Sequence, residues 1–399
     1  MTDGPVFRGS FTQQEPIAEE AIEAALRVLR SGRLHRYNVA PGEVSETALL
    51  EREFAEAQGA RYCLACASGG YAMQLALRAW GLRPEEPVLT NAFTLSPVPG
   101  SIVAAGGRPA LVETTAALTI DLDDLAAKID ATGARLLLVS HMRGHLADMD
   151  ALTALLEAKG VALIEDCAHT MGARWRGRPS GSFGVAACFS AQTYKHVNAG
   201  EGGLLTSDDP DLTARAIVLS GSYMLYDRHL AGPPPEAYAR IRFETPNCSG
   251  RMDDLRAAIL RPQLRALGDA AARWNARYRA VEAELAAGGA LTVPARPPEE
   301  GFVGSSIQFL AARGDAAAAR AFVAAATARG VEVKWFGDAE PRGYTSRHDS
   351  WRYLEPAVLP KTDAVLARLF DMRLPLTFSL EDCRLIGRIL RRCAEATLV

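Results

Sequence analysis

The sequence predicts an α/β protein built on a largely parallel sheet with helices packed on both faces. Short apolar runs with the length of buried strands alternate with longer segments whose apolar residues recur at helical spacing. Glycine, proline or acidic residues separate most strands from the helices that follow. Because a strand–helix–strand unit joins parallel strands, this order favours one sheet between two helical layers.

Most of these units lie in the first half of the chain. Helices are expected at residues 17–29, 45–58, 71–80, 97–105, 148–159 and 212–219. Strands are expected at residues 61–67, 88–94, 109–112, 136–140, 161–164, 185–189 and 204–206. Ser45 is a good first cap, and Ser31-Gly32 ends the first helix. The carboxyl ends of parallel strands share one edge, so we expect Ser68, Phe93, His141, Asp166 and Ser190 to converge there.

The second half indicates a smaller second domain. Residues 221–243 carry prolines and aromatics and are expected to form a long loop over the site. Later elements are expected at residues 247–264, 266–287 and 316–329 (helices), 307–311 and 331–336 (strands), and from residue 380 (a last helix). The predicted organisation is an N-terminal arm and helix (1–30), a large domain (31–262) and a small C-terminal domain (263–399).

Composition excludes several classes of protein. A chain of 399 residues with 48% hydrophobic and 23% charged residues is ordinary for two packed domains. The net charge of −3 lacks the basic excess of nucleic-acid-binding and membrane-surface proteins. No apolar run approaches the ~20 residues of a membrane span. The acidic, polar N-terminus does not resemble a signal peptide, so a cytoplasmic location is expected.

The cysteines predict neither disulfides nor a metal site. Their count of seven is odd and their spacing is irregular. Cys63 and Cys66 form a C-x-x-C pair, but no second pair completes a zinc site. We therefore expect both to be small buried residues of a strand.

The residues that indicate a chemistry are concentrated between 161 and 207. A buried strand delivers Glu165-Asp166, the next delivers Ser190, and Lys195 follows five positions later, before a glycine-rich loop. A lysine and an aspartate at neighbouring strand ends suit pyridoxal phosphate (PLP): the lysine forms a Schiff base with it, and the aspartate pairs with its ring nitrogen. Upstream, Ser68-Gly69-Gly70 joins a strand to a helix N-terminus, which is an anion site to which we assign the PLP phosphate.

Several motifs in this stretch resemble one enzyme family. They are Glu165-Asp166-Cys167-Ala168-His169, Gly181-Ser182-Phe183-Gly184, Cys188-Phe189-Ser190, Lys195 and Gly200-Glu201-Gly202-Gly203. Together they resemble the DegT/DnrJ/StrS family of fold type I PLP enzymes, which are mostly aminotransferases. The variants around Asp166 and Lys195 are most similar to the branch with aminohydroxybenzoate synthase and scyllo-inosose aminotransferases. The resemblance implies a seven-stranded sheet, a small second domain and a homodimer with shared active sites.

The resemblance also implies roles for individual residues. Lys195 holds PLP and then moves the substrate's proton, while Asp166 keeps the ring nitrogen protonated. The other implied cofactor contacts are Phe93 stacked on the ring, His169 near the ring oxygen, Ser190 at the phosphate, and Gln192 at the phosphate or substrate.

The sequence departs from the family pattern at three positions. Gly70 replaces a threonine and so lacks a hydroxyl donor, and Arg143 stands where an aromatic is frequent. Ser249 replaces an asparagine that reaches the partner subunit's phosphate, and Asn247 lies two positions earlier; either is a candidate for that contact. Residues 33–41 correspond to an arm near a neighbouring subunit's site, although an exposed basic loop is the commoner explanation.

Candidate substrate residues are Arg143, His196, Trp335 and Arg347, with an unusual insertion at residues 338–353 that also holds Arg342 and Trp351. A surface salt bridge for Arg143 and a solvated loop for the insertion are alternatives of at least equal weight. His141 is expected to be a satisfied structural histidine.

Three functions fit these residues. The first is transfer of an amino group from glutamate or glutamine to a keto sugar, cyclitol or related ketone, which the intact Lys195 favours. The second is a PLP-dependent elimination, dehydration or cyclisation, and the third is a non-catalytic, PLP-binding regulatory protein. The sequence does not identify the acceptor.

Overall fold

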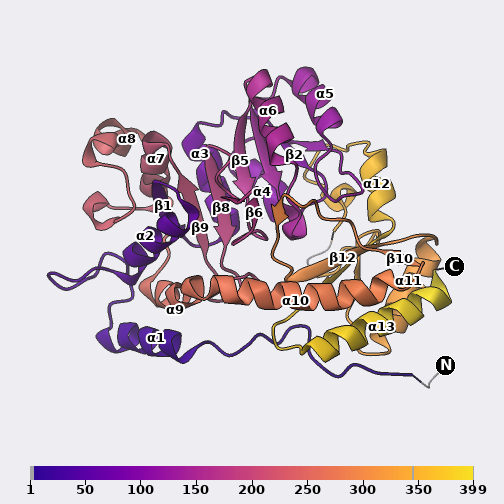
Figure 1. The fold of residues 1–399 in the computed structure, drawn as a ribbon. Coiled ribbons are helices and arrows are strands. Elements are labelled where there is room, and N and C mark those ends of the chain that lie inside the picture. The colour runs from indigo at the N-terminus through magenta and orange to yellow at the C-terminus, as the bar shows by residue number, and fades with distance from the viewer. Residues whose placement is uncertain (1–3, 344–345, 399) are drawn as a thin grey trace.

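The computed structural model describes residues 4–343 and 346–398. A seven-stranded sheet with strand order β1-β9-β8-β5-β4-β2-β3 forms the centre of the larger part (Figure 1). Its strands are β1 (Tyr62–Cys66), β2 (Pro87–Asn91), β3 (Arg108–Val112), β4 (Leu136–Ser140), β5 (Ala162–Asp166), β8 (Ala186–Ser190) and β9 (Gly203–Ser207). The pairs β3–β2, β2–β4, β4–β5 and β5–β8 are parallel, and β9 runs antiparallel to both β8 and β1. The predicted mostly parallel sheet is confirmed.

Helices cover both faces of this sheet. They are α2 (Glu46–Gln58), α3 (Gly69–Trp80), α4 (Pro97–Ala104), α5 (Leu122–Thr132), α6 (Met149–Lys159), α7 (Pro210–Ser220), α8 (Tyr238–Glu244) and α9 (Asp254–Arg265). Alternate residues of a strand point to opposite faces. Accordingly Leu136 and Leu138 of β4 pack with α3, α4 and α7, whereas Leu137 and Val139 pack with α5 and α6. The sequence predicted every helix of this set except α5 and the short α8.

A four-stranded antiparallel sheet of order β10-β12-β14-β13 forms the smaller part. Its strands are β10 (Leu291–Thr292), β12 (Ser306–Ala311), β13 (Lys334–Trp335) and β14 (Leu369–Arg373), and its helices are α11 (Ala316–Thr327), α12 (Pro360–Leu366) and α13 (Leu380–Thr397). A third sheet joins β6 (Arg174–Trp175), β7 (Arg178–Pro179) and β11 (Glu300–Gly301). The expected strand at 331–336 is reduced to β13.

The long helix α10 (Leu267–Ala286) connects the two parts and runs beneath both of them in Figure 1. Trp274 packs in the core of the large sheet, whereas Tyr278 and Val281 pack in the core of the small one. The N-terminal segment joins the small part as well, since Phe7 and Phe11 make edge contacts with Phe378 before α1 (Glu19–Ser31) begins. The domain boundary predicted at 262–263 falls inside α9 and stays a prediction.

The segment at residues 221–243 does not cover the site in this chain. It contains two single-turn 3-10 helices, η2 (Tyr226–Arg228) and η3 (Pro235–Ala237), and leads into α8. Tyr238 is buried in the core beside α7 and stacks on Tyr226 at 4.0 Å between ring centroids. Stacked aromatics hold the segment on α7, and none of its residues lines the cavity that contains Lys195.

Residues 33–41 form an irregular segment, as expected, but Arg36 is not exposed. Its side chain is 1% exposed, and its guanidinium makes two hydrogen bonds, of 2.7 and 2.8 Å, to Glu51 on α2. His229 lies 3.0 Å from the same guanidinium and 2.8 Å from the Tyr37 hydroxyl. A charge removed from water needs such partners. This arginine is therefore a buried anchor of the segment and not one of its solvent-exposed side chains.

Loss of Arg36 is expected to destabilise the fold strongly. An Arg36→Met variant leaves Glu51 buried without its counter-charge, which costs about 3–5 kcal/mol in free energy of unfolding. Arg33→Met is the control, because Arg33 pairs with Glu43 at an exposed site where the loss is about 0–1 kcal/mol. Urea denaturation of both variants measures the difference. A loss below 1 kcal/mol in free energy of unfolding for Arg36→Met would contradict the stabilising role given to the buried Arg36–Glu51 pair.

The same pair predicts a pH dependence. Burial acts to raise the pKa of Glu51, but Arg36 and His229 outweigh it and lower the pKa from 4.5 to about 2. A carboxylate with a lowered pKa contributes stability above its unfolded pKa, and that contribution disappears as pH falls toward the folded pKa. The wild-type protein should therefore lose stability between pH 4.5 and 2 through this group, more steeply than Arg36→Met.

Candidate active site

A cavity of about 260 Å³ lies at the carboxyl ends of β4, β5 and β8, beside the N-terminus of α3. Eight of the predicted site residues line it: Ser68, Gly69, Gly70, Asp166, His169, Ser190, Gln192 and Lys195. Sequence reasoning missed other lining residues, among them Thr94, Leu95, Ser140, Met142 and Glu201. Their convergence follows from parallel strands, whose carboxyl ends open at one edge of the sheet.

Lys195 and His169 form a close pair in this cavity. The lysine Nζ lies 2.7 Å from Nε2 of His169, and Nδ1 of the same ring accepts the backbone N–H of Arg143 at 3.2 Å. A ring nitrogen that accepts a hydrogen bond carries no proton, so we assign the imidazole proton to Nε2. That N–H then donates to Nζ, which requires a lysine amine in its neutral, nucleophilic form.

The electrostatics favour the same protonation state. Burial and the nearby Arg143 and Arg373 lower the pKa of Lys195 to about 7, although Asp166 acts in the opposite direction. Burial and then Lys195 hold the pKa of His169 well below 6.5. Burial disfavours the charged form of both groups, so His169 is neutral at neutral pH and Lys195 loses its proton near pH 7.

Asp166 ends β5 and is oriented by two donors. Its Oδ2 accepts the Ser140 hydroxyl at 2.7 Å, and its Oδ1 accepts the backbone N–H of Ala168 at 3.1 Å. Ser140 ends β4 directly opposite Asp166 in the parallel register. Each carboxylate oxygen keeps a further lone pair for a donor in the cavity. Ser140 could have been predicted as a site residue from the sequence, because it lies at the end of a predicted strand.

The N-terminus of α3 forms the other end of the cavity. The Ser68 side chain caps the helix by accepting the Tyr71 N–H at 3.1 Å, so its hydroxyl is already engaged. The first helical amides, those of Gly69 and Gly70, precede the intrahelical hydrogen bonds and suit an anion. Close packing requires glycine here, because a Cβ on Gly69 would lie 2.8 Å from the Ser190 Cβ and one on Gly203 would lie 2.2 Å from the Ser68 carbonyl.

Comparison with known proteins identifies the family. The model of the DegT/DnrJ/EryC1/StrS aminotransferase family matches residues 15–391. The chain belongs to this family. A GDP-perosamine synthase from Caulobacter vibrioides is 33% identical over 218 residues, which cover 54% of this chain and 55% of that protein. Matches to three curated relatives span only 54–63% of their lengths.

Two solved structures share the fold over nearly the whole chain. DesV from S. venezuelae, in complex with a ketimine intermediate, is 26% identical with a TM-score of 0.79 and covers 96% of this chain and 99% of its own. A 3-amino-5-hydroxybenzoic acid synthase is 22% identical with a TM-score of 0.81 over 97% and 99%. The latter likeness concerns the fold alone. Among the described residues, none of the helices has both the length and the apolarity to cross a membrane.

The residues of this family member fit PLP. The Asp166 carboxylate would suit a ring nitrogen and the Lys195 amine an aldehyde, and the Gly69 and Gly70 amides with the Ser190 hydroxyl would suit a phosphate. Glycine at position 70 opens space at this end, where a Cβ would have Pro97 Cβ as its nearest neighbour at 3.8 Å.

The predicted stacking role of Phe93 is wrong for this chain. Its side chain is 1% exposed and makes an edge contact with Phe336 at 5.1 Å, in a cluster with Leu118 that faces the small part. A hydrogen bond from the Phe93 N–H to Thr114 fixes the backbone in that orientation. Leu95, two residues on, lines the cavity instead. In an extended segment Phe93 and Leu95, two residues apart, would point to the same face. The strand ends at Asn91, so this alternation does not hold beyond it and the two side chains point in different directions.

Asn247 and Ser249 lie outside this cavity. Asn247 Oδ1 accepts both the N–H of Ser249, at 3.0 Å, and its hydroxyl, at 3.2 Å. Ser249 has a φ of 49°, a backbone conformation that this local pairing supports. Neither residue reaches the Lys195 site of its own chain, and the predicted contact with a partner subunit stays a prediction.

The candidate substrate residues divide into two groups. Arg143 lines a small neighbouring cavity together with Lys195 and His169. His196 instead bonds to Ser305 at 2.9 Å and packs on Trp274. Trp335 and Arg347 do not line the cavity: the Trp335 indole donates to the Ala367 carbonyl in the small core, and Arg347 pairs with Asp349 and Asp363. Trp335 and Arg347 are therefore engaged by neighbouring protein groups and do not have the substrate contact expected for them.

The insertion at residues 338–353 packs on the outside of the site. Trp351 is buried in a small cluster with Leu359, and the Tyr353 hydroxyl donates to the Ser96 carbonyl at 3.3 Å. Arg342 pairs with Asp338 at 3.3 Å. Residues 344–345 lie outside the described residues. The segment thus approaches the start of α4, whose residue Pro97 lines the cavity, without itself entering it. His141 is buried and its Nε2 lies 3.1 Å from Glu165, whereas its Nδ1 has no hydrogen-bond partner among the described residues, so the expected satisfied histidine is found at one ring nitrogen only.

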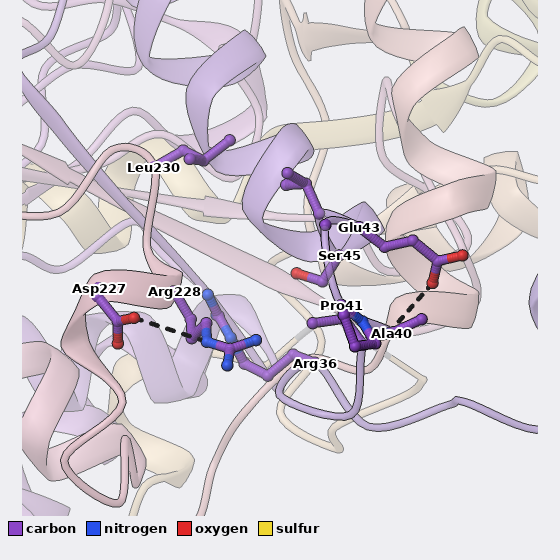
Figure 2. A pocket seen from close by; sticks show the side chains of 11 residues that line it. Arg36, Ala40, Pro41, Glu43, Ser45, Asp227, Arg228 and Leu230 are labelled. Atoms are coloured by element: carbon purple, nitrogen blue, oxygen red, sulfur yellow. Dashed lines mark hydrogen bonds and ion pairs between the residues drawn. The ribbon is translucent and has the colours of Figure 1, made fainter.

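A larger cavity of about 490 Å³ lies elsewhere (Figure 2). It opens between residues 36–45 and the 227–230 segment, with Glu43 bonded to the Ala40 N–H and Asp227 beside Arg228. None of the predicted catalytic residues lines it. Size alone does not locate the chemistry, which follows the convergence of Lys195 and Asp166.

Proposed function

We propose that this protein is a PLP-dependent aminotransferase that moves an amino group from glutamate or glutamine to a keto sugar, cyclitol or related ketone. The observation that carries the proposal is the presence of Lys195 and Asp166 on the walls of one cavity whose far end is a helix N-terminus. Membership of the aminotransferase family and a GDP-perosamine synthase among the relatives support it.

The chain's own residues provide the acid–base work. When bound, PLP supplies an aldehyde that accepts the amino group and a ring that withdraws electrons. Asp166, held by Ser140 and the Ala168 N–H, would stabilise a proton on the ring nitrogen. The neutral Lys195 Nζ would take the proton from the substrate carbon that bears the amino group. His169 would keep the lysine amine oriented.

The half-reaction with an amino donor tests this proposal. Purified protein loaded with PLP is mixed with L-glutamate or L-glutamine, without acceptor, and absorbance follows conversion of the aldehyde cofactor to its amine form. Conversion by either donor supports transamination. If neither donor converts it, the aminotransferase is excluded, and release of water or ammonia from a substrate would then indicate the elimination alternative. An unchanged cofactor under all these conditions leaves the regulatory alternative.

Capture of PLP by the cofactor-free protein should depend on pH with a midpoint near 7. The neutral amine is the reactive form, and burial with Arg143 lowers the pKa of Lys195 to about 7. The capture rate should therefore rise with pH through this midpoint and fall about fivefold between pH 7 and pH 6. Stopped-flow absorbance measures the rate, with Lys195→Ala subtracting capture by exposed lysines. A rate that keeps rising toward pH 10 would contradict the neutral lysine.

We also propose a homodimer with shared active sites. Asn247, Ser249 and residues 33–41 correspond to family positions that face a neighbouring subunit, and all of them lie outside the Lys195 cavity of their own chain. Exposed Tyr223, Met224 and Phe243 lie near them in sequence and suit burial in an interface. Sedimentation equilibrium tests the assembly, and a monomer at micromolar concentration with full activity would exclude shared sites.

A further inference from the structure

A much smaller cavity also has Lys195 and His169 in its walls. These two residues line both cavities, so a molecule at Lys195 has access to each. The small cavity measures about 30 Å³, which is room for one or two water-sized groups. Its walls join the large part to the small one, because Arg143 follows β4 whereas Ser306 begins β12 and Arg373 ends β14.

Arg143 is the unusual group in this cavity. Its side chain is 8% exposed, and among the residues that the structure describes Nε and Nη2 find no aligned hydrogen-bond acceptor. Asp371 lies 2.9 Å from Nη2 as an ion pair, and its other oxygen is occupied by the Gln308 amide. Buried N–H groups without an acceptor are unfavourable, so the guanidinium is prepared for an anionic ligand.

The backbone and the neighbouring charges hold Arg143 in this position. Its φ of 55° and ψ of 24° are left-handed, a conformation that arginine seldom adopts and that local structure must maintain. Burial lowers the pKa of Arg143 despite Asp371, and Arg373 adds to the effect. Lys334 is subject to the same field, since burial and Arg373 lower its pKa to about 8. Asp371 therefore does not outweigh the effect of burial on Arg143.

We propose that Arg143, with Arg373 beside it, binds the carboxylate of a substrate while the reacting carbon lies at Lys195. This assignment rests on the proposed aminotransferase function. A carboxylate has two oxygens that match two guanidinium N–H groups, and it is small enough for this cavity, whereas a sugar ring is not. The α-carboxylate of the amino donor is one bond from the carbon that reacts, which suits a cavity that adjoins Lys195; a carboxylate on the acceptor is the other source.

Binding of glutarate, which is glutamate without its amino group, tests the subsite directly. Calorimetry on PLP-loaded protein should give binding that Arg143→Gln weakens by about 10- to 100-fold, the effect of losing hydrogen bonds to a charged group. Arg143→Lys should recover only part, because an ammonium lacks the paired N–H geometry. Arg135→Gln, which removes an exposed arginine paired with Glu86, is the matched control. Equal binding by wild type and Arg143→Gln overturns the proposal.

A variant with the opposite expected sign guards against a merely structural effect. Asp371→Asn removes the carboxylate that competes for Arg143 and should tighten glutarate binding several-fold. General damage to the cavity would weaken binding instead. Weaker binding by a folded Asp371→Asn, judged by an unchanged thermal transition, therefore counts against the subsite, and it does so even if Arg143→Gln does not fold.

The two half-reactions distinguish the sources of the carboxylate. A raised KM for L-glutamate in Arg143→Gln, with the KM for the ketone unchanged, assigns the subsite to the donor, and the reverse pattern assigns it to the acceptor. No change in either KM overturns the proposal. Failure of the proposed function is separate, because the cofactor would then not be converted by any donor even where glutarate binding still depends on Arg143.

Discussion

Replacement of Lys195 by arginine is expected to abolish covalent capture of PLP and to slow the donor half-reaction by at least about 10²- to 10⁴-fold, the usual effect of losing a positioned general base. Arginine keeps a positive charge and a long side chain but stays protonated, so it supplies neither a nucleophile nor a base. The buried site penalises that fixed charge, which the native lysine avoids through a pKa of about 7. Borohydride reduction followed by mass spectrometry measures the covalent link, and absorbance measures the half-reaction.

The control for this variant is a second, partly buried lysine. Lys334→Arg also changes an amine whose pKa is lowered, by burial first, to about 8, but this residue lines none of the three cavities that have Lys195 in their walls. It should keep covalent capture of PLP at position 195. If Lys195→Arg were still reduced onto PLP at a single site, another lysine would hold the cofactor, and the roles assigned to Asp166 and His169 would fall with it.

The sequence predicted the elements that position the site because their signals are local. Alternating apolar strands and capped helices such as α2 and α6 follow from short-range patterns, and Ser45 and Asp148 cap them in the structure. The motifs around Asp166 and Lys195 resemble those of a family whose fold places both residues at one cavity. The seven-stranded sheet was expected from the family resemblance as well as from the pattern.

What the sequence did not predict depends on side-chain direction and on contacts between distant segments. Phe93 and Leu95 differ by two positions, and only the path of the chain after β2 decides that Leu95 faces the cavity. Arg36 appeared to belong to an exposed loop because its partners, Glu51 and His229, come from other elements. Arg373 was missed for the same reason, since nothing near it in sequence indicates that β14 ends beside Lys195.

Replacement of Asp166 by asparagine should slow removal of the substrate proton by about 10²- to 10³-fold, as expected when a group placed to stabilise developing charge is neutralised. Asparagine keeps the shape of the side chain: its Oδ1 can still accept the Ala168 N–H, and its Nδ2 can donate to the Ser140 hydroxyl oxygen, so the cavity should remain intact. What it loses is the negative charge opposite the ring nitrogen. The rate of the glutamate half-reaction and its isotope effect with α-deuterated glutamate measure the change.

Ser140→Ala separates the charge of Asp166 from its orientation. This variant leaves the carboxylate in place and removes one of its two donors, a hydrogen bond to a charged group worth roughly 1.5–3 kcal/mol, so we expect about a 10- to 100-fold effect at most. The isotope effect should grow in the order wild type, Ser140→Ala, Asp166→Asn, because proton removal becomes progressively more rate-limiting. A rate for Asp166→Asn within threefold of wild type, with a normal thermal transition, would mean that the carboxylate is structural and that the electron-withdrawing ring works without it.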